Sequence, residues 1–471
     1  MEAVIASLAI AGAVWGAIFL VRGTLLSGCL LYLFLVSCCG IELFRFDAGF
    51  VMMSIDRVFV VLLAAMYVLH RRLDKAEPKL LTPLDYVLFA LVGLIAASAV
   101  FQKLTGNGLE GAPGSKTMTP VIIHMINGYL IPLVIYWVAR QAKIKEPDLR
   151  KMLAAAVCFG IYLAATGLLE FFGQWELVFP KYIADPTVGL HYGRARGPMV
   201  QSVSYGLYLG ACWLIALAWS ERLGRWGQLG VVLLTPLFLA GLYCTHTRSV
   251  WMGAALGGLI VLWATLRGAW RVLVLGSIVT AGLLVAATNW DRIVSMQRGD
   301  NSAESTRESA QLRKSFAYVS WKMFQDRPLL GVGFGQFARE KIPYLDDRTV
   351  DLRLDPIRDW SHHNTFLSLL TEEGAIGLAL FVILLLGWVA RAVRLRRDRW
   401  ADAAARTQAV AFLAVLGLYA FQLLFHDVTF TPLDNSLIFF LAGITAGMTS
   451  PHTPQVKLAY RTERFMAQAS R

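Results

Sequence analysis

Apolar runs of about twenty residues dominate the chain and are separated by short polar segments. A run of this length crosses the hydrocarbon core of a bilayer as an α-helix, which satisfies its own backbone hydrogen bonds there. Hydrophobic residues make up 56% of the 471 positions and charged residues only 16%. Soluble domains carry more charge than this. The sequence therefore predicts an all-α, polytopic membrane protein and excludes a soluble enzyme.

The runs predict about thirteen transmembrane helices with an error of about one, so we expect about 12–13 spans and no internal repeat. They imply an N-terminal membrane part over 1–287, a long polar loop over 288–362, a C-terminal membrane part over 363–449 and a tail over 450–471. The predicted spans lie near 3–21, 26–43, 51–69, 84–102, 120–139, 151–172, 200–219, 228–246, 250–266, 271–287, 363–389, 405–426 and 433–449.

The net charge of +12 is concentrated in short loops between the runs, chiefly near 71–79, 140–151 and 391–399. This distribution is typical of cytoplasmic loops in membrane proteins and does not indicate nucleic-acid binding. It places the C-terminal tail in the cytoplasm and the long loop outside. The six cysteines lie in or beside apolar runs without framework spacing, so they are interpreted as packing residues.

The long loop contains a predicted amphipathic helix from about Glu304 to Asp326. Leu312, Phe316, Val319 and Phe324 fall roughly on one face of it, and Asp326-Arg327-Pro328 ends it. The glycine-rich stretch at 331–335 could cradle a phosphate, but a tight turn between two helices is the preferred interpretation. We expect the loop to form a helical cap over the outer membrane surface.

The junction between the loop and the next apolar run holds several ionisable groups, and placing such groups near lipid costs free energy. If Ser361 or Asn364 caps the following helix, His363 lies at its N-terminus, where the helix dipole favours a neutral imidazole that can accept a proton. Gly374 follows ten residues further on and is predicted on nearly the same helix face, where it would allow close approach of another chain or a lipid. Glu373 could orient a partner or pair with an arginine.

Arginines lie near other predicted outer span ends, with Arg194 and Arg196 before one span and Arg248 in a tight turn between two. The first two could simply contact lipid head groups, whereas the short turn favours an inward-pointing Arg248. The outer histidines show no ligand spacing with a carboxylate alongside, so no metal site is expected. A neutral histidine with separate arginines suggests that a diphosphate is held while a hydroxyl is deprotonated.

At these residues the chain resembles the O-antigen ligase and O-antigen polymerase superfamily of bacterial envelope enzymes. The resemblance covers roughly 190 to 390. It is carried by His363-Asn364-Thr365-Phe366-Leu367 with Glu373-Gly374 and Gly377, by Arg327-Pro328-Leu329-Leu330-Gly331-Val332-Gly333, by Thr247-Arg248-Ser249 and by Arg196-Gly197.

The resemblance implies a metal-independent, cofactor-free glycosyltransferase. Such an enzyme moves a glycan from undecaprenyl diphosphate to an acceptor hydroxyl at the periplasmic face of the bacterial inner membrane. The histidine-to-glycine spacing is more like that of ligases, whose acceptor is a lipid A core sugar in lipopolysaccharide biosynthesis. The resemblance implies His363 as the general base, and Arg196 and Arg248 as diphosphate ligands with Arg194 as a possible substitute. We further predict Glu373 as a catalytic residue and Asn364 as a substrate-binding residue.

Two departures leave the acceptor open. The predicted span count exceeds that usual for ligases, and the Gln201-Ser202 stretch lacks an expected asparagine. A polymerase or other exopolysaccharide-joining enzyme of the same superfamily, with another lipid-linked unit as acceptor, is the main alternative. Protein O-glycosylating relatives are a weaker one. A lipid-linked sugar transporter is disfavoured, because the polar groups crowd one side and no repeated halves are evident.

Overall fold

The computed structural model describes residues 12, 14–43, 45–47, 52–110, 119–288, 303–428 and 431–449. This part of the chain is helical apart from two short antiparallel pairs, β1 (Arg45–Asp47) with β2 (Met52–Ser54) and β3 (Leu109–Glu110) with β4 (Thr119–Pro120). The helices are α2 (Leu25–Leu43), α3 (Ile55–Arg72), α4 (Pro83–Leu104), α5 (Val121–Met125), α6 (Ile131–Arg140), α7 (Glu146–Phe171), α8 (Ser202–Trp219), α9 (Arg225–Cys244), α10 (Arg248–Thr265), α11 (Gly268–Thr288), α13 (Ala303–Asp326), α14 (Phe337–Glu340), α15 (Thr365–Glu372), α16 (Gly374–Arg397), α17 (Ala403–Leu423) and α18 (Pro432–Met448).

The predicted all-α membrane architecture is confirmed. Within the described residues, 8 helical stretches are long and apolar enough to span a membrane, and α2, α11 and α18 add shorter apolar helices. The predicted span at 51–69 corresponds to α3, which carries Arg57, Arg71 and Arg72 and is less apolar than the others. The predicted span at 3–21 lies largely outside the described residues, as do the start of the long loop and the tail at 450–471.

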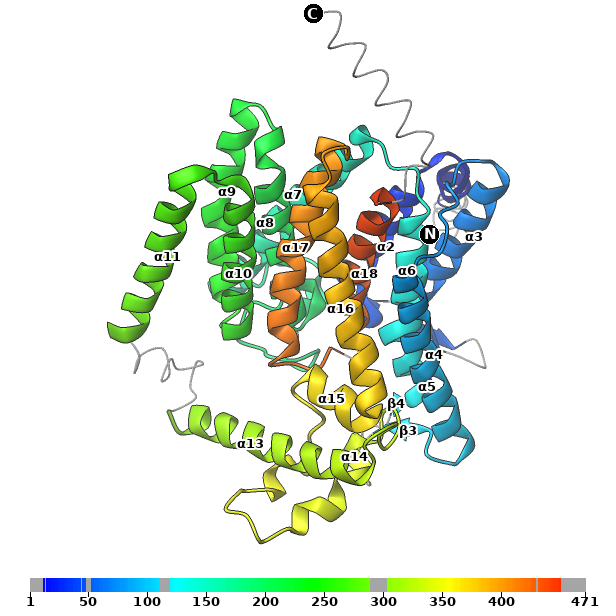
Figure 1. Cartoon of the computed structure of the whole chain (residues 1–471), viewed down its shortest axis with the longest axis vertical. Helices are drawn as coiled ribbons and strands as arrows, with labels where there is room; N and C mark the ends of the chain where they lie inside the picture. Colours follow the sequence, from blue (N-terminus) through cyan, green and yellow to red (C-terminus); the bar gives the residue numbers. More distant parts are fainter. Residues whose placement is uncertain are drawn as a thin grey trace, which may run out of the picture.

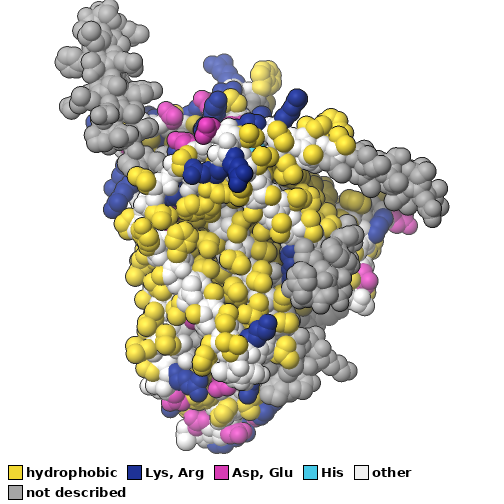
Figure 2. Space-filling view, turned by 90° about the vertical axis from the view of Figure 1, so that its right-hand side faces the viewer, with side chains coloured by type: hydrophobic (Ala, Val, Ile, Leu, Met, Phe, Trp, Pro, Cys, Tyr) yellow, Lys and Arg dark blue, Asp and Glu magenta, His cyan; other side chains and the backbone are white. Residues whose placement is uncertain are grey.

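The helices form an upright bundle in which α8 and α18 are almost entirely buried (Figure 1). Small residues bring the backbones together, as is usual between membrane helices. A Cβ on Gly443 would lie 2.5 Å from the Tyr136 carbonyl of α6, and one on Gly253 would lie 2.8 Å from the Leu418 carbonyl of α17. Figure 2 shows a broad hydrophobic belt over one side of the bundle, with most charged side chains beyond its two ends.

The described residues of the long loop, 303–362, fold as a cap on the bundle. Helix α13 lies across one end of the bundle (Figure 1), and we call this end the cap end. Its apolar face, with Phe316, Val319 and Met323, packs into a small separate core that also contains Phe337 and Leu345. The glycine-rich stretch after it is the predicted turn, and three of its glycines have positive φ.

The predicted continuous span at 363–389 is wrong, because the chain breaks into α15 and α16 between Glu373 and Gly374. Gly374 has a φ of +65°, and a Cβ there would meet the Leu329 carbonyl oxygen at 2.3 Å. The carbonyls of Pro328 and Leu329 accept hydrogen bonds from Ala375 N and Ile376 N, which are first-turn donors that α16 cannot satisfy itself. His363 and Gly374 therefore do not share a helix face, and the close approach at Gly374 is made by the cap.

Candidate functional site

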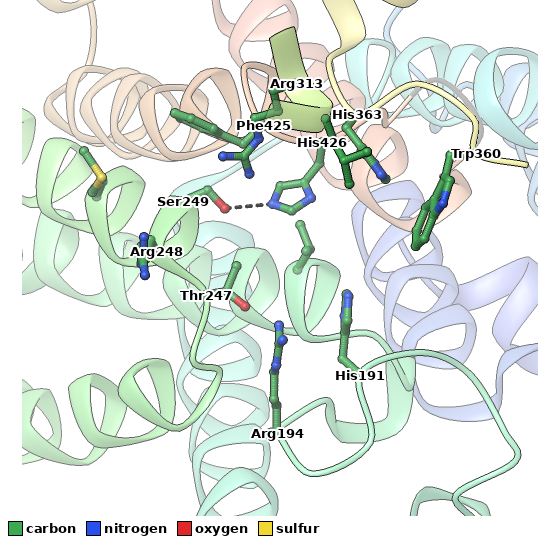
Figure 3. A pocket seen from close by; sticks show the side chains of 13 residues that line it. His191, Arg194, Thr247, Arg248, Ser249, Arg313, Trp360, His363, Phe425 and His426 are labelled. Atoms are coloured by element: carbon green, nitrogen blue, oxygen red, sulfur yellow. Dashed lines mark hydrogen bonds between the residues drawn. The ribbon is translucent and has the colours of Figure 1, made fainter. Parts of the chain in front are cut away.

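A cavity of about 450 Å³ opens at the cap end, where α8, α10 and α17 meet the underside of α13 (Figure 3). Its polar lining is rich in nitrogen bases and contains no carboxylate among the described residues. The lining comprises His191, Arg194, Val203, Thr247, Arg248, Ser249, Met252, Leu312, Arg313, Trp360, His363, Phe425 and His426.

Arg194 reaches the cavity from the loop between α7 and α8. Its neighbour Arg196 is fully buried and points away, with its guanidinium donating to the carbonyls of Val188 at 2.5 Å, Asp185 at 2.6 Å and Ile183 at 2.8 Å. Arg196 thus ties the loop together from inside, while Arg194, two residues earlier, is left half-buried at the cavity wall.

The same loop is fixed to the bundle at two further points. The Glu170 carboxylate at the end of α7 accepts from the backbone N–H groups of Arg196 at 3.2 Å and Gly197 at 2.7 Å. His191, with a φ of +63°, lies 3.0 Å through Nδ1 from the Ser202 hydroxyl at the start of α8. These contacts hold Arg194 and His191 on one side of the cavity (Figure 3).

Arg248 is the first residue of α10, directly after the predicted tight turn between two membrane helices. The Thr247 hydroxyl donates to Ser202 Oγ at 3.2 Å, which joins this turn to the His191 loop. Ser249 lies 2.9 Å from Nε2 of His426, at the end of α17.

The cap contributes Arg313, whose guanidinium lies over the Phe425 ring at 5.4 Å. Desolvation and the positive charge of Arg248 both lower the pKa of Arg313. The positive charges of Arg248 and Arg313 therefore repel each other across the cavity, and an anion bound between them would reduce this repulsion. Arg313 was not predicted as a site residue. Its sequence signal was its place beside Leu312 and three residues before Phe316, on the apolar side of the amphipathic helix.

His363 precedes α15 and faces the cavity (Figure 3). Phe316 packs edge-on against its ring at 5.3 Å, and Trp360 lies at 5.6 Å. Burial lowers its pKa, and the charges of Arg313 and Lys341 lower it further. Each of these effects favours the neutral form of the ring, which can accept a proton. His362 is directed elsewhere, because it is buried with Nε2 2.7 Å from the Thr371 hydroxyl.

The structure brings together three of the six site residues named from the sequence, namely His363, Arg194 and Arg248. Arg196 lies behind the cavity wall. Asn364 is the N-cap of α15, accepting from Leu367 N at 3.0 Å and donating to the Leu424 carbonyl at 2.9 Å. In the described contacts, Arg196 and Asn364 therefore hold the site in place and do not line the cavity.

Glu373 lies outside the cavity lining, at the break between α15 and α16. It is buried, and burial raises its pKa to about 8. Its neighbour Glu372 fixes the glycine-rich turn, because its carboxylate accepts hydrogen bonds from the backbone N–H groups of Gly335 at 3.0 Å and Phe337 at 3.1 Å. Glu372 thereby occupies backbone N–H groups that a phosphate bound at the glycine-rich turn would need as donors.

The described residues contain no group of three or more His, Cys, Asp or Glu side chains placed to hold a metal ion. What the cavity offers instead is three guanidinium groups, three imidazoles and one partly exposed indole, that of Trp360. Guanidinium groups bind phosphate oxygens in a two-pronged geometry, and an indole face suits the apolar face of a sugar. This set suits a phosphorylated, sugar-bearing ligand.

Comparison with known proteins points to the same region. Residues 230–382 match the family described as "O-Antigen ligase", and this segment runs from α9 through the cap to the first part of α16. The O-antigen ligase of Salmonella typhimurium strain LT2 is 25% identical over 166 residues, which are 33% of this chain. The chain matches only 38% of that protein's length. The resemblance to the O-antigen ligase family that the sequence motifs predicted is therefore confirmed, and it is over residues 230–382 that the match to the family lies.

Proposed function

We propose that the chain is a metal-independent glycosyltransferase of the O-antigen ligase type, acting at the periplasmic face of the bacterial inner membrane. Its donor is a glycan on undecaprenyl diphosphate, and its acceptor is the hydroxyl of a lipid A core sugar. The observation that carries the proposal is the cavity at the cap end. It combines Arg194, Arg248 and Arg313 with a neutral His363 and has no carboxylate among its described lining residues.

The arginines supply the charge that a leaving diphosphate requires. They come from three separate parts of the chain, so they can surround the group on different sides, and two come from rigid helices. Fixed guanidinium groups in a partly enclosed site stabilise developing negative charge more strongly than water does. The expected orientation supports the proposal, because the basic short loops lie at the opposite end of the bundle from the cap.

In the proposed reaction the acceptor hydroxyl oxygen attacks the anomeric carbon of the donor sugar. The bond from that carbon to the diphosphate oxygen breaks, and its electron pair leaves with undecaprenyl diphosphate. His363 takes the proton of the hydroxyl and later releases it to solvent. Arg248, Arg194 and Arg313 hold the diphosphate before and after bond cleavage, with Arg196 keeping the Arg194 loop in place.

The test is transfer by purified protein in detergent, given a lipid-diphosphate-linked glycan and one of two acceptors. Transfer to lipid A core supports the ligase. Chain growth on a second lipid-linked unit without transfer to lipid A core would instead assign a polymerase with the same site. Absence of both reactions, in protein that still binds the donor, would refute glycosyl transfer to these acceptors. Matched variants Arg248→Ala and Arg225→Ala, an arginine outside the cavity, separate site loss from general charge loss.

A further inference from the structure

A second, larger hollow of about 960 Å³ lies at the opposite end of the bundle, between α4, α6, α16, α17 and α18. The two hollows share α17: Ala405, near its start, lines this groove, whereas Phe425, just past its end, lines the cavity. Twenty helical residues correspond to roughly 30 Å, so this groove is separate from the proposed reaction site. It is bordered by the basic short loops that were expected to face the cytoplasm.

The charged side chains of the groove differ in whether they form an ion pair. The Glu77 carboxylate pairs with Lys79 at 2.7 Å, and the buried Arg140 pairs with Asp85 at 3.0 Å. Within the described part of the chain, Arg391 hydrogen-bonds to the hydroxyl groups of Thr82 and Tyr136. Among the described residues, neither Arg391 nor the exposed Arg394 has a carboxylate within ion-pair distance.

The groove changes character along α16. Arg391 and Arg394 stand near its basic end, and Ala390, Gly387 and Ile383 continue the same stripe one to three turns closer to the middle of the bundle. Leu84 and Val87 of α4 form the facing wall. The groove therefore offers cations at the depth of a lipid head group and an apolar channel that continues into the hydrophobic belt.

We propose that this groove is a binding site for an anionic phospholipid of the cytoplasmic leaflet. The phosphate would lie on Arg391 and Arg394, and one acyl chain would follow Ile383, Leu84 and Val87. A free phosphate ion would leave the apolar channel unused. Asp398 and Asp402 also line the groove, so the preference for an anionic over a zwitterionic head group rests on Arg391 and Arg394, which have no ion-pair partner among the described residues. Basic pockets between membrane helices commonly recognise anionic head groups in this way.

The experiment adds dioleoyl phosphatidylglycerol to delipidated full-length protein in detergent and measures bound lipid by native mass spectrometry. Because each basic residue near a head group contributes modestly, the double variant Arg391→Gln/Arg394→Gln should bind roughly thirtyfold more weakly. The matched control Arg397→Gln/Arg399→Gln removes the same charge outside the groove and should stay within about twofold of wild type.

Further variants keep the test decisive. Arg391 bonds to two hydroxyls, so if its loss harms folding, Arg394→Gln alone should still weaken binding roughly fivefold. Ala390→Trp should obstruct the groove without changing charge and should also displace the lipid. Equal weakening by both double variants would overturn the proposal, since it would indicate general attraction to basic residues. Displacement of the lipid by millimolar inorganic phosphate would overturn it in favour of a free-anion site.

Discussion

The neighbouring arginines Arg194 and Arg196 allow a sharp test, because the structure gives them opposite roles. Arg196→Ala removes three hydrogen bonds from a charged donor, those to the carbonyls of Ile183, Asp185 and Val188. At about 1.5 kcal/mol for each such bond, the loss is about 4.5 kcal/mol. Arg194→Ala removes a half-buried side chain at the cavity wall and should cost about 1 kcal/mol or less.

The assay measures thermal unfolding and glycan transfer on the same detergent preparations. Arg196→Ala should unfold at a clearly lower temperature and lose activity as a consequence, whereas Arg194→Ala should unfold normally and lose affinity for the donor. Arg196→Lys should be nearly as unstable as Arg196→Ala, because one ammonium cannot reproduce the planar fork. The reasoning is refuted if Arg196→Ala keeps wild-type stability and shows only weaker donor use, the behaviour of a diphosphate ligand.

Five further outcomes are expected. His363→Ala should abolish transfer without loss of folding; in wild type the acid limb of the pH–rate profile should lie below pH 6.5, because a lowered pKa keeps the base neutral until the solution is more acidic. Arg313→Gln removes one cause of that shift and should move the limb to higher pH; an unmoved limb would contradict the assignment. Arg248→Ala should weaken donor use more than Arg248→Lys, measured as the donor KM, and wild-type values for both would remove its role. EDTA should not inhibit transfer; inhibition reversed by zinc would disprove the metal-independent mechanism. Gly374→Ala should destabilise by about 3 kcal/mol in thermal unfolding, more than Gly106→Ala, where φ is also positive but no atom lies within 4 Å.

The sequence predicted the helical parts of this fold well, since a membrane span and an amphipathic cap helix each leave a strong periodic signal. Helix α13 ends at Asp326, as the following Arg327-Pro328 indicated. The break at Gly374 was missed because the apolar pattern continues through it. Its cause is a contact with Leu329, more than forty positions earlier, which periodicity within one run does not contain.

The site was predicted less completely, and Arg194 and Arg196 show the reason. Both precede the same span, and composition does not reveal which of the two turns inward to hold its own loop. That choice depends on carbonyls of 183–188 and on Glu170. Arg313 was missed for a related reason, because the cap had been expected to cover the membrane surface, whereas its helix also forms one wall of the cavity.

Helix α13 is joined to the bundle just beyond its C-terminal end. Backbone hydrogen bonds fasten residues 328–333 to residues 371–376, whereas Arg313 lies thirteen positions before Asp326, the last residue of the helix. Thirteen helical residues correspond to an arm of roughly 20 Å. A tilt of roughly 10° about the fastened end would carry Arg313 by roughly 3 Å, about the length of one hydrogen bond. A change of this size in the angle of the cap would therefore alter how far Arg313 lies from the other two guanidinium groups of the cavity.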